Sequence, residues 1–214
     1  VDTLTTVQGV IASKPLYLGT YTITEITAPE GYLLDDTPHD VTLAYGGRAV
    51  KLVAESLSIE NAPQMGTITI SKVDKETGKP IVDADAVFEL RAAEDIITAD
   101  GTVRYGKGQL IETLTTKNGV VTSGWLYLGS YAVTEITAPE GYLLDDTSHD
   151  VTLAYGGQDV AFIAESLTVE NAPQRGQIVI NKVDSETGKP IILSPATFSV
   201  YAASDIITPD GTVR

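Results

Sequence analysis

Residues 126–157 read LYLGSYAVTEITAPEGYLLDDTSHDVTLAYGG, and residues 16–47 carry almost the same letters. The two stretches are offset by 110 positions. A fixed period of this length indicates a tandem array in which each repeat is one domain of immunoglobulin size. The repeat, rather than the total length, therefore sets the domain organisation.

Two flanking motifs give the phase of the array. Asn61 in SIENAPQ returns as Asn171 in TVENAPQ, and Lys72 in ISKVDKETGKP returns as Lys182 in INKVDSETGKP, each with the same offset of 110. We therefore expect one complete repeat and two partial ones. Residues 1–64 would be the C-terminal part of a repeat, 65–174 a complete repeat, and 175–214 the N-terminal part of another.

The pattern inside each repeat is typical of an all-β fold. Short alternating or β-branched runs such as TITIS, YAVTEI and SLTVEN are separated by turn signals, among them Asn118-Gly119 and Asp100-Gly101. No stretch sustains a helical period. The sequence therefore predicts tandem β-sandwich domains of the immunoglobulin-like or prealbumin-like type.

Three polar residues in the complete repeat fall on the apolar face of their strands. Side chains alternate between the two faces of a strand, so residues two apart share a face. Three such rows end in a polar residue: Ile68, Ile70 and Lys72; Tyr131, Val133 and Glu135; and Leu167, Val169 and Asn171. The partial repeats carry the same rows: Tyr21, Ile23 and Glu25; Leu57, Ile59 and Asn61; and Ile178, Ile180 and Lys182.

A single inward lysine or glutamate at a strand end can reach solvent along its aliphatic stem. An amine, an acid and a carboxamide that all point inward are harder to explain in this way. Because a buried unpaired charge costs several kcal/mol, we expect the three groups either to neutralise one another or to react.

The motifs ISKVDKETGKP, YAVTEITAPEGY and LTVENAP resemble the CnaB-type (SpaA-like, prealbumin-like) domains of Gram-positive pilins and surface adhesins. The TEITAPEGY segment is similar to the E-box of that family. The resemblance implies an isopeptide bond in which Lys72 is the nucleophile, Asn171 the acceptor and Glu135 the catalyst. It also implies an extracellular protein anchored to the cell wall, with signal and anchor outside this segment.

The implied reaction is chemically reasonable. Burial favours the neutral forms of an amine and an acid, so Lys72 can attack while Glu135 binds the carboxamide oxygen of Asn171 and transfers protons. Neighbours fixed in a dry core react at high effective molarity. The reaction occurs once per molecule, so the chain is not expected to be an enzyme. The bond would join residues 99 positions apart and serve a structural stalk.

Composition excludes several other classes of function. With 29 acidic and 14 basic residues the formal charge is -15, which disfavours nucleic acid and anionic membranes as partners. The absence of cysteine excludes disulfides and thiolate chemistry. No apolar run has membrane-spanning length. We expect neither a cofactor nor a metal ion.

The two partial repeats together supply nearly one complete site, with Lys182 at one end and Glu25 and Asn61 at the other. Each end alone would expose an unpaired strand edge. We therefore expect head-to-tail pairing between chains in addition to contacts between neighbouring repeats. An intermolecular bond between Lys182 and Asn61, catalysed by Glu25, would make such chains covalent. The alternative is that the ends are frayed pieces of a longer array.

Other readings remain open at this stage. The repeats could bind a host matrix or glycan ligand through polar loops at residues 92–107 and 154–160. His39 and His149 occupy equivalent positions beside an Asp, but no nucleophile motif accompanies them, so we expect strand-edge residues. The aspartates at 83, 85, 95 and 100 lack the spacing of a calcium loop. Phe88 and Phe198 are expected to pack in the cores.

Overall fold

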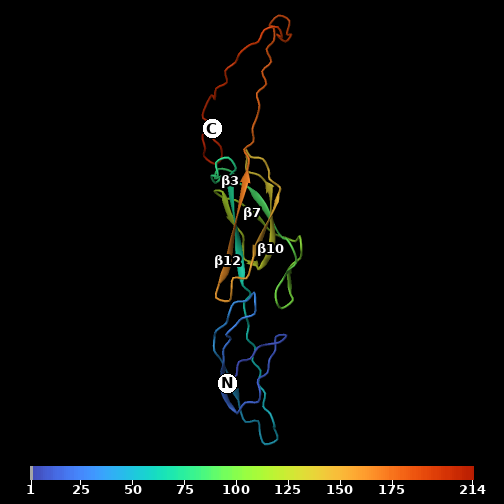
Figure 1. The fold of residues 1–214 in the computed structure, drawn as a ribbon, viewed down its shortest axis with the longest axis vertical. Helices are drawn as coiled ribbons and strands as arrows, with labels where there is room; N and C mark the ends of the chain where they lie inside the picture. The colour runs from blue at the N-terminus through green and yellow to red at the C-terminus, as the bar shows by residue number, and fades with distance from the viewer. Residues whose placement is uncertain (1) are drawn as a thin grey trace. The chain divides into compact units, whose positions relative to one another are not determined.

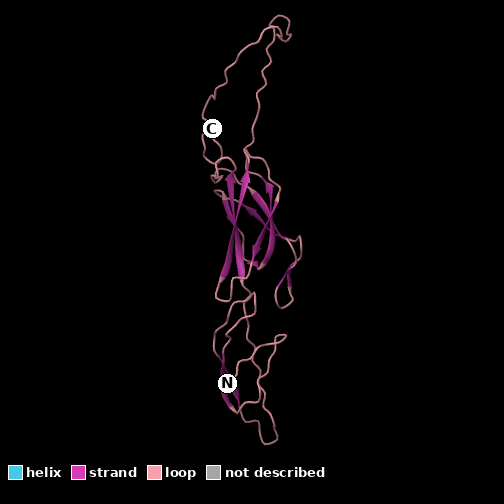
Figure 2. Ribbon diagram, in the orientation of Figure 1, coloured by secondary structure: helices cyan, strands magenta, loops and turns pink. Residues whose placement is uncertain are grey.

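The computed structural model describes residues 2–214, which contain twelve β-strands and no helix (Figures 1 and 2). Residues 2–214 thus contain no helix that is long and apolar enough to cross a membrane. The chain forms two compact units. The smaller unit consists of the N-terminal segment up to Gln64 together with Tyr155–Ala161. The larger unit consists of Met65–Ala154 and Phe162–Arg214. The all-β class predicted from the sequence is confirmed.

The larger unit contains a sandwich of two sheets. In the first sheet the strand order is β11-β10-β4-β7, and every neighbouring pair is antiparallel. Its strands are β4 (Val87–Ala92), β7 (Leu110–Thr115), β10 (Gly129–Thr137) and β11 (Ser148–Leu153).

The second sheet has the order β12-β3-β8, with β9 also paired to β3. Its strands are β3 (Met65–Asp74), β8 (Val120–Thr122), β9 (Leu126–Tyr127) and β12 (Phe162–Asn171). The first and last strands of the domain, β3 and β12, run side by side and parallel over their whole length (Figure 1). Met65 pairs with Phe162 at one end, and Asp74 pairs with Asn171 at the other.

Two further strand pairs lie outside the sandwich sheets. The β5 strand (Ile96–Ile97) and β6 (Val103–Tyr105) form a small antiparallel hairpin in the larger unit. In the smaller unit, β1 (Gly19–Ile23) pairs with β2 (His39–Leu43).

The sandwich core follows the alternation predicted from the sequence. Along β3 every second side chain is buried, and the same is true of β4. Apolar side chains that exclude water from the space between the sheets include Ile68, Ile70, Phe88, Leu90, Tyr131 and Val133, all without solvent exposure. Lys72, Glu135 and Asn171 lie in the same inward rows.

A tight turn between β7 and β8 brings a loop against β3. Asn118 and Gly119 have φ angles of 52° and 78°, the positive values that a two-residue hairpin turn of this kind requires. A side chain at Gly119 would lie 3.1 Å from the carbonyl oxygen of Ile81. The predicted turn is confirmed, and its carbonyl group points at the backbone of Lys72.

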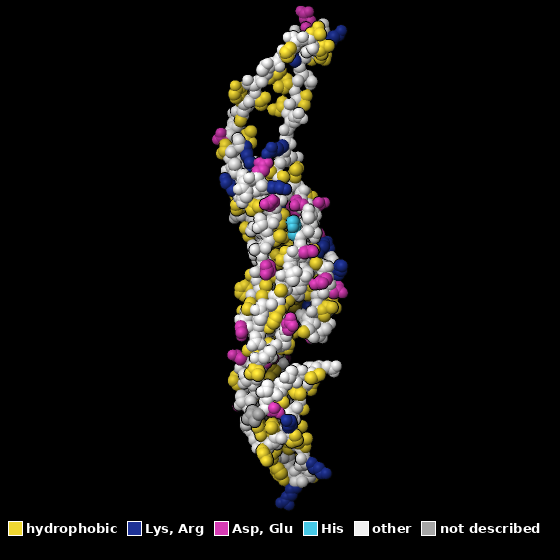
Figure 3. Space-filling model, viewed as in Figure 1, with side chains coloured by type: hydrophobic (Ala, Val, Ile, Leu, Met, Phe, Trp, Pro, Cys, Tyr) yellow, Lys and Arg dark blue, Asp and Glu magenta, His cyan; other side chains and the backbone are white. Residues whose placement is uncertain are grey.

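The terminal segment from residue 175 differs from the prediction. Residues 175–214 form no ladder strand, and the inward row expected there is open to solvent, with Ile178 73% and Ile180 49% exposed. Phe198, which we expected to pack in a core, is 51% exposed. Figure 3 shows hydrophobic side chains uncovered along this segment. The physical reason is that none of the strands in residues 2–214 packs against this row, so the row has no opposite face to bury.

Candidate functional site

The backbone of Lys72 is held by two loop residues, Gly119 and Ile81. Its backbone N–H donates to the carbonyl oxygen of Gly119 at 2.7 Å, and its carbonyl oxygen accepts from the N–H of Ile81 at 3.0 Å. The side chain is completely buried. Its Nζ atom lies 5.7 Å from the ring centre of Phe88. The amine therefore has a fixed position inside the sandwich.

Glu135 faces Lys72 from the opposite sheet. Its Oε1 atom lies 3.1 Å from Lys72 Nζ, and neither side chain has any solvent exposure. Its Oε2 atom accepts from the backbone N–H of Asp145 at 3.1 Å. The pairing of β10 with β4 shifts register between Glu135 and Thr137, an irregularity of the kind that re-aims a side chain.

Asn171, the last residue of β12, completes the group. Its Nδ2 atom donates to Glu135 Oε2 at 2.8 Å and to the carbonyl oxygen of Leu143 at 2.6 Å. We expected Glu135 to meet the carboxamide oxygen, but the structure places the amide nitrogen there. The reason is the Leu143 carbonyl, which accepts a hydrogen bond from a nitrogen but would repel an oxygen.

Three polar atoms of this group remain without a hydrogen bond: Lys72 Nζ, Glu135 Oε1 and Asn171 Oδ1. The contact between Nζ and Oε1 has an ion-pair distance but does not have hydrogen-bond geometry. A buried polar atom without a partner is costly and rare in folded proteins. The polar groups of the site are thus closely packed, but only some of their atoms have hydrogen-bond partners.

Burial also changes the chemistry of the amine. Removal of Lys72 from water lowers its pKa, because the charged form loses hydration; the negative charge of Glu135 opposes this effect and is the smaller of the two. The neutral amine, which carries a nucleophilic lone pair, is therefore favoured relative to an exposed lysine.

The segment after β10 is tied to the end of β12. Leu143 N–H donates to the carbonyl oxygen of Ala172 at 2.9 Å, and Gln174 N–H donates to that of Gly141 at 2.8 Å. The hydroxyl of Tyr142 donates to Asp74 Oδ2 at 2.9 Å in a buried position. These hydrogen bonds fix the position of Asn171 relative to Glu135.

Sequence reasoning missed Asp74, Tyr142 and Leu143. Asp74 shares the parity of Lys72 on β3, so the inward row could have been extended by one residue to find it. Leu143 acts through its backbone carbonyl, and a backbone group leaves no signal in the residue type.

A family model provides the decisive comparison. The SpaA model, described as a prealbumin-like fold domain, matches residues 1–56 and 66–165. This chain belongs to the SpaA family. Among curated protein sequences no match reaches significance.

Solved structures of SpaA-like architecture resemble the chain. The Bacillus anthracis TIE protein is 24% identical with a TM-score of 0.53, and the match covers 74% of this chain and 26% of that one. The group B streptococcus pilus 2b backbone protein is 27% identical with a TM-score of 0.39, over 65% of this chain and 45% of that one. The chain thus spans about a quarter of the first protein and less than half of the second.

The smaller unit repeats part of this arrangement of polar side chains. Asn61 Nδ2 donates to Glu25 Oε2 at 2.6 Å and to the carbonyl oxygen of Leu33 at 3.0 Å. The N–H of Asp35 donates to the same Glu25 oxygen at 3.1 Å. These contacts repeat those of the complete site. Lys182 is exposed in the larger unit and is not part of this pair.

The other polar candidates of the SpaA repeats form no comparable cluster. His39 and His149 lie half-buried on β2 and β11, where strand-edge residues were expected. Within residues 2–214 no group of three or more His, Cys, Asp or Glu side chains is arranged to hold a metal ion.

Proposed function

We propose that this chain is a load-bearing segment of an extracellular stalk anchored to a bacterial cell wall. Its complete domain would be locked by an isopeptide bond between Lys72 and Asn171. One observation carries the proposal: Glu135 contacts Lys72 Nζ at 3.1 Å through one oxygen and Asn171 Nδ2 at 2.8 Å through the other, with all three side chains buried.

The reaction is a transamidation that needs no external reagent. The neutral Nζ of Lys72 attacks Cγ of Asn171, the Cγ–Nδ2 bond breaks, and a Cγ–Nζ amide forms. Glu135, as its carboxylate, accepts a proton from Nζ through Oε1 and passes it to the departing Nδ2, so ammonia leaves and the carboxylate is regenerated. The contact between Glu135 and the amide nitrogen supports this role as proton carrier.

The strand arrangement supports a mechanical role. Tension applied to a tandem array enters β3 at Met65 and leaves β12 after Asn171, which are opposite ends of two parallel paired strands. Such a load shears the whole ladder at once instead of opening it bond by bond. With Lys72 joined to Asn171, the load crosses a covalent bond, and residues 73–170 carry none of it.

The half-site of the smaller unit supports a second step of the same proposal. Glu25 and Asn61 are arranged as their counterparts are in the complete domain, and they lack only an amine. Lys182 is the exposed counterpart of Lys72. Docking of one chain's C-terminal segment onto the smaller unit of another chain would supply that amine. The result would be head-to-tail chains, either covalent or noncovalent.

Intact mass under denaturing conditions tests the central bond. Each bond expels ammonia, so the folded chain should weigh about 17 Da less than its sequence requires. A mass equal to that of the unmodified sequence would overturn the proposal.

A further inference from the structure

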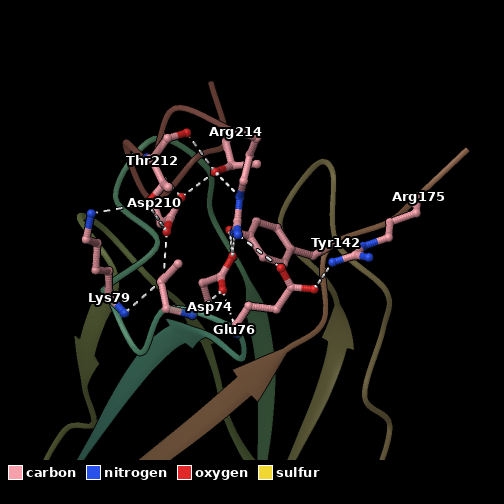
Figure 4. A network of polar contacts seen from close by, with 10 residues as sticks. Asp74, Glu76, Lys79, Tyr142, Arg175, Asp210, Thr212 and Arg214 are labelled. Carbon is pink, nitrogen blue, oxygen red and sulfur yellow. Dashed lines mark hydrogen bonds and ion pairs between the residues drawn. The ribbon is translucent and has the colours of Figure 1, made fainter. Parts of the chain in front are cut away.

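The C-terminal end of the chain lies against the turn that follows β3 (Figure 4). This end forms a loop of residues 208–214, TPDGTVR, and the turn is residues 74–79, DKETGK. Both belong to the larger compact unit. Nearly the same sequence occurs 110 positions earlier, where residues 98–104 read TADGTVR in the β5–β6 hairpin and differ only at the second letter. The structure therefore shows the same loop in two surroundings.

The internal structure of the loop is the same in both copies. In the first, Asp100 Oδ1 accepts from Thr98 Oγ1 at 2.5 Å and from the N–H of Thr102 at 3.1 Å. In the second, Asp210 Oδ1 accepts from the equivalent hydroxyl at 2.5 Å and from the equivalent N–H at 3.1 Å. The loop is thus a preformed element that does not need to change its backbone to dock.

The second copy makes additional contacts. Its Pro209 carbonyl oxygen accepts from the backbone N–H groups of Val82 and Asp83 at 3.0 and 3.1 Å. Asp210 Oδ2 accepts from Thr77 Oγ1 at 2.7 Å. Asp210 is consequently 7% exposed, whereas Asp100 in the undocked copy is an exposed residue.

The arginine at the end of the loop changes partner between the copies. In the undocked loop, the Arg104 guanidinium lies 4.8 Å from the ring centre of Tyr127, in its own domain. In the docked loop, Arg214 donates through Nη2 to Asp74 Oδ2 at 2.9 Å and through Nη1 to Glu76 Oε2 at 3.0 Å. Asp74 is completely buried, so its carboxylate benefits from a cation that reaches it.

The receiving turn also occurs twice, docked and undocked. Residues 184–189 read DSETGK and differ from residues 74–79 only at the second letter. In this undocked copy, Thr187 Oγ1 donates to its own Asp184 at 2.8 Å. In the docked copy, Thr77 Oγ1 donates instead to Asp210 of the loop. Both partners therefore exchange an internal contact for one across the junction.

We propose that the T-x-D-G-T-V-R loop of each repeat docks onto the D-x-E-T-G-K turn of the preceding repeat. The partner of this surface is thus the next copy of the same repeat. The loop's arginine binds two carboxylates of the turn, and its aspartate accepts a hydrogen bond from the turn's threonine. One carbonyl oxygen of the loop accepts from two backbone N–H groups that follow the turn. Every full repeat carries one loop and one turn, so the contact propagates head to tail. It does not depend on the isopeptide bond, and it limits rotation between consecutive domains.

Amide hydrogen exchange, measured by NMR on the full chain, tests this contact. The N–H groups of Val82 and Asp83 are protected by Pro209, so Arg214→Ala should speed their exchange by about tenfold or more. Arg104→Ala is the matched control, because it removes the same arginine from the undocked loop, and it should leave both rates unchanged. The Lys72 amide, protected by Gly119 inside the sandwich, reports that the domain remains folded.

A second pair of variants tests the reciprocal side. Thr77→Val removes the hydroxyl that donates to Asp210 and should speed the same two amides, while Thr187→Val should not. The proposal is overturned if Arg214→Ala and Thr77→Val leave Val82 and Asp83 as protected as in the parent chain. It is equally overturned if the two control variants deprotect them to the same extent.

Discussion

Lys72 and Asn171 lie on parallel neighbouring strands, offset by two positions of the ladder. Val169 pairs with Lys72, and Asn171 pairs with Asp74. The two side chains therefore share a face, and Glu135 reaches both from the facing sheet. This relationship supports four predictions about the bond and its consequences.

The first prediction concerns the catalyst. Glu135→Gln keeps the size of the side chain but removes its ability to carry a proton, so the domain should fold while the bond forms at least about a hundredfold more slowly. Intact mass followed over time after refolding measures this. Glu25→Gln, the same change in the smaller unit, should leave the Lys72 to Asn171 bond at its normal rate. Normal bond formation in Glu135→Gln would remove Glu135 from the mechanism.

The second prediction concerns mechanical extension. With the proposed bond formed, the 98 residues between Lys72 and Asn171 cannot lengthen under tension. Asn171→Ala prevents the bond, so unfolding should release roughly 330 Å of additional chain, at about 3.3 Å per residue. Single-molecule stretching of tandem arrays measures the step length directly. Equal steps in the parent and variant arrays would show that the bond carries no load.

The bond should also stabilise the domain against denaturant. A closed loop of this size contributes about 4 to 5 kcal/mol by restricting the unfolded chain. Asn171→Ala should therefore lower the unfolding free energy by an amount of that order. Asn61→Ala, which changes the equivalent residue of the smaller unit, should leave the unfolding of the complete domain unaltered.

The fourth prediction is a pH dependence in the variant that cannot react. Burial lowers the pKa of Lys72 below its ordinary value of 10.5. Between the lowered pKa and 10.5 the unfolded chain holds a proton that the folded domain does not, so the unfolding free energy of Asn171→Ala rises with pH in that window. Acidification should reverse the gain as the pH falls toward the folded pKa.

Urea unfolding at several pH values measures this slope. The double variant Lys72→Met, Asn171→Ala is the control, because it lacks the titrating amine but keeps all other ionisable groups. The difference in slope between the two variants isolates Lys72. Identical slopes would mean that burial does not lower the pKa of this amine.

The sequence predicted the burial of three polar residues better than it predicted their surroundings. Strand parity placed Lys72, Glu135 and Asn171 on the inner face because alternation is a local property of a strand, and all three are buried. The same rule failed for Ile178 and Ile180, which are exposed because burial also requires a facing strand. Parity identifies the two faces of one strand, but it does not predict whether another strand packs against either face.

Long-range pairing explains what the sequence did not predict. The parallel contact between β3 and β12 joins the two ends of the domain, and no local pattern specifies it. The Leu143 carbonyl that orients Asn171 is a backbone group, so the predicted contact between Glu135 and the amide oxygen was wrong. The Asn118-Gly119 turn, by contrast, was predictable because its backbone preference lies in two adjacent residues.

The last prediction concerns covalent chains. The smaller unit presents Asn61 to Glu25 without an amine, and Lys182 is exposed on a segment whose apolar row is open to solvent. At high protein concentration the parent chain should form a ladder on denaturing gels. Each added bond should lower the combined mass by about 17 Da. Lys182→Ala should abolish the ladder, whereas Lys189→Ala, which removes an exposed lysine from the same segment, should not.

Mixing two blocked variants gives the sharpest form of this test. Lys182→Ala keeps the acceptor Asn61 but has no amine to offer, and Asn61→Ala keeps Lys182 but has no acceptor. Neither should polymerise alone. Because only one bond can form between a molecule of each, their mixture should yield a covalent dimer and nothing longer. A ladder in either variant alone, or the absence of dimer while the parent chain forms a ladder, would show that Lys182 and Asn61 are not the partners. If the parent chain also stays monomeric at high concentration by light scattering, the exposed half-sites do not associate at all.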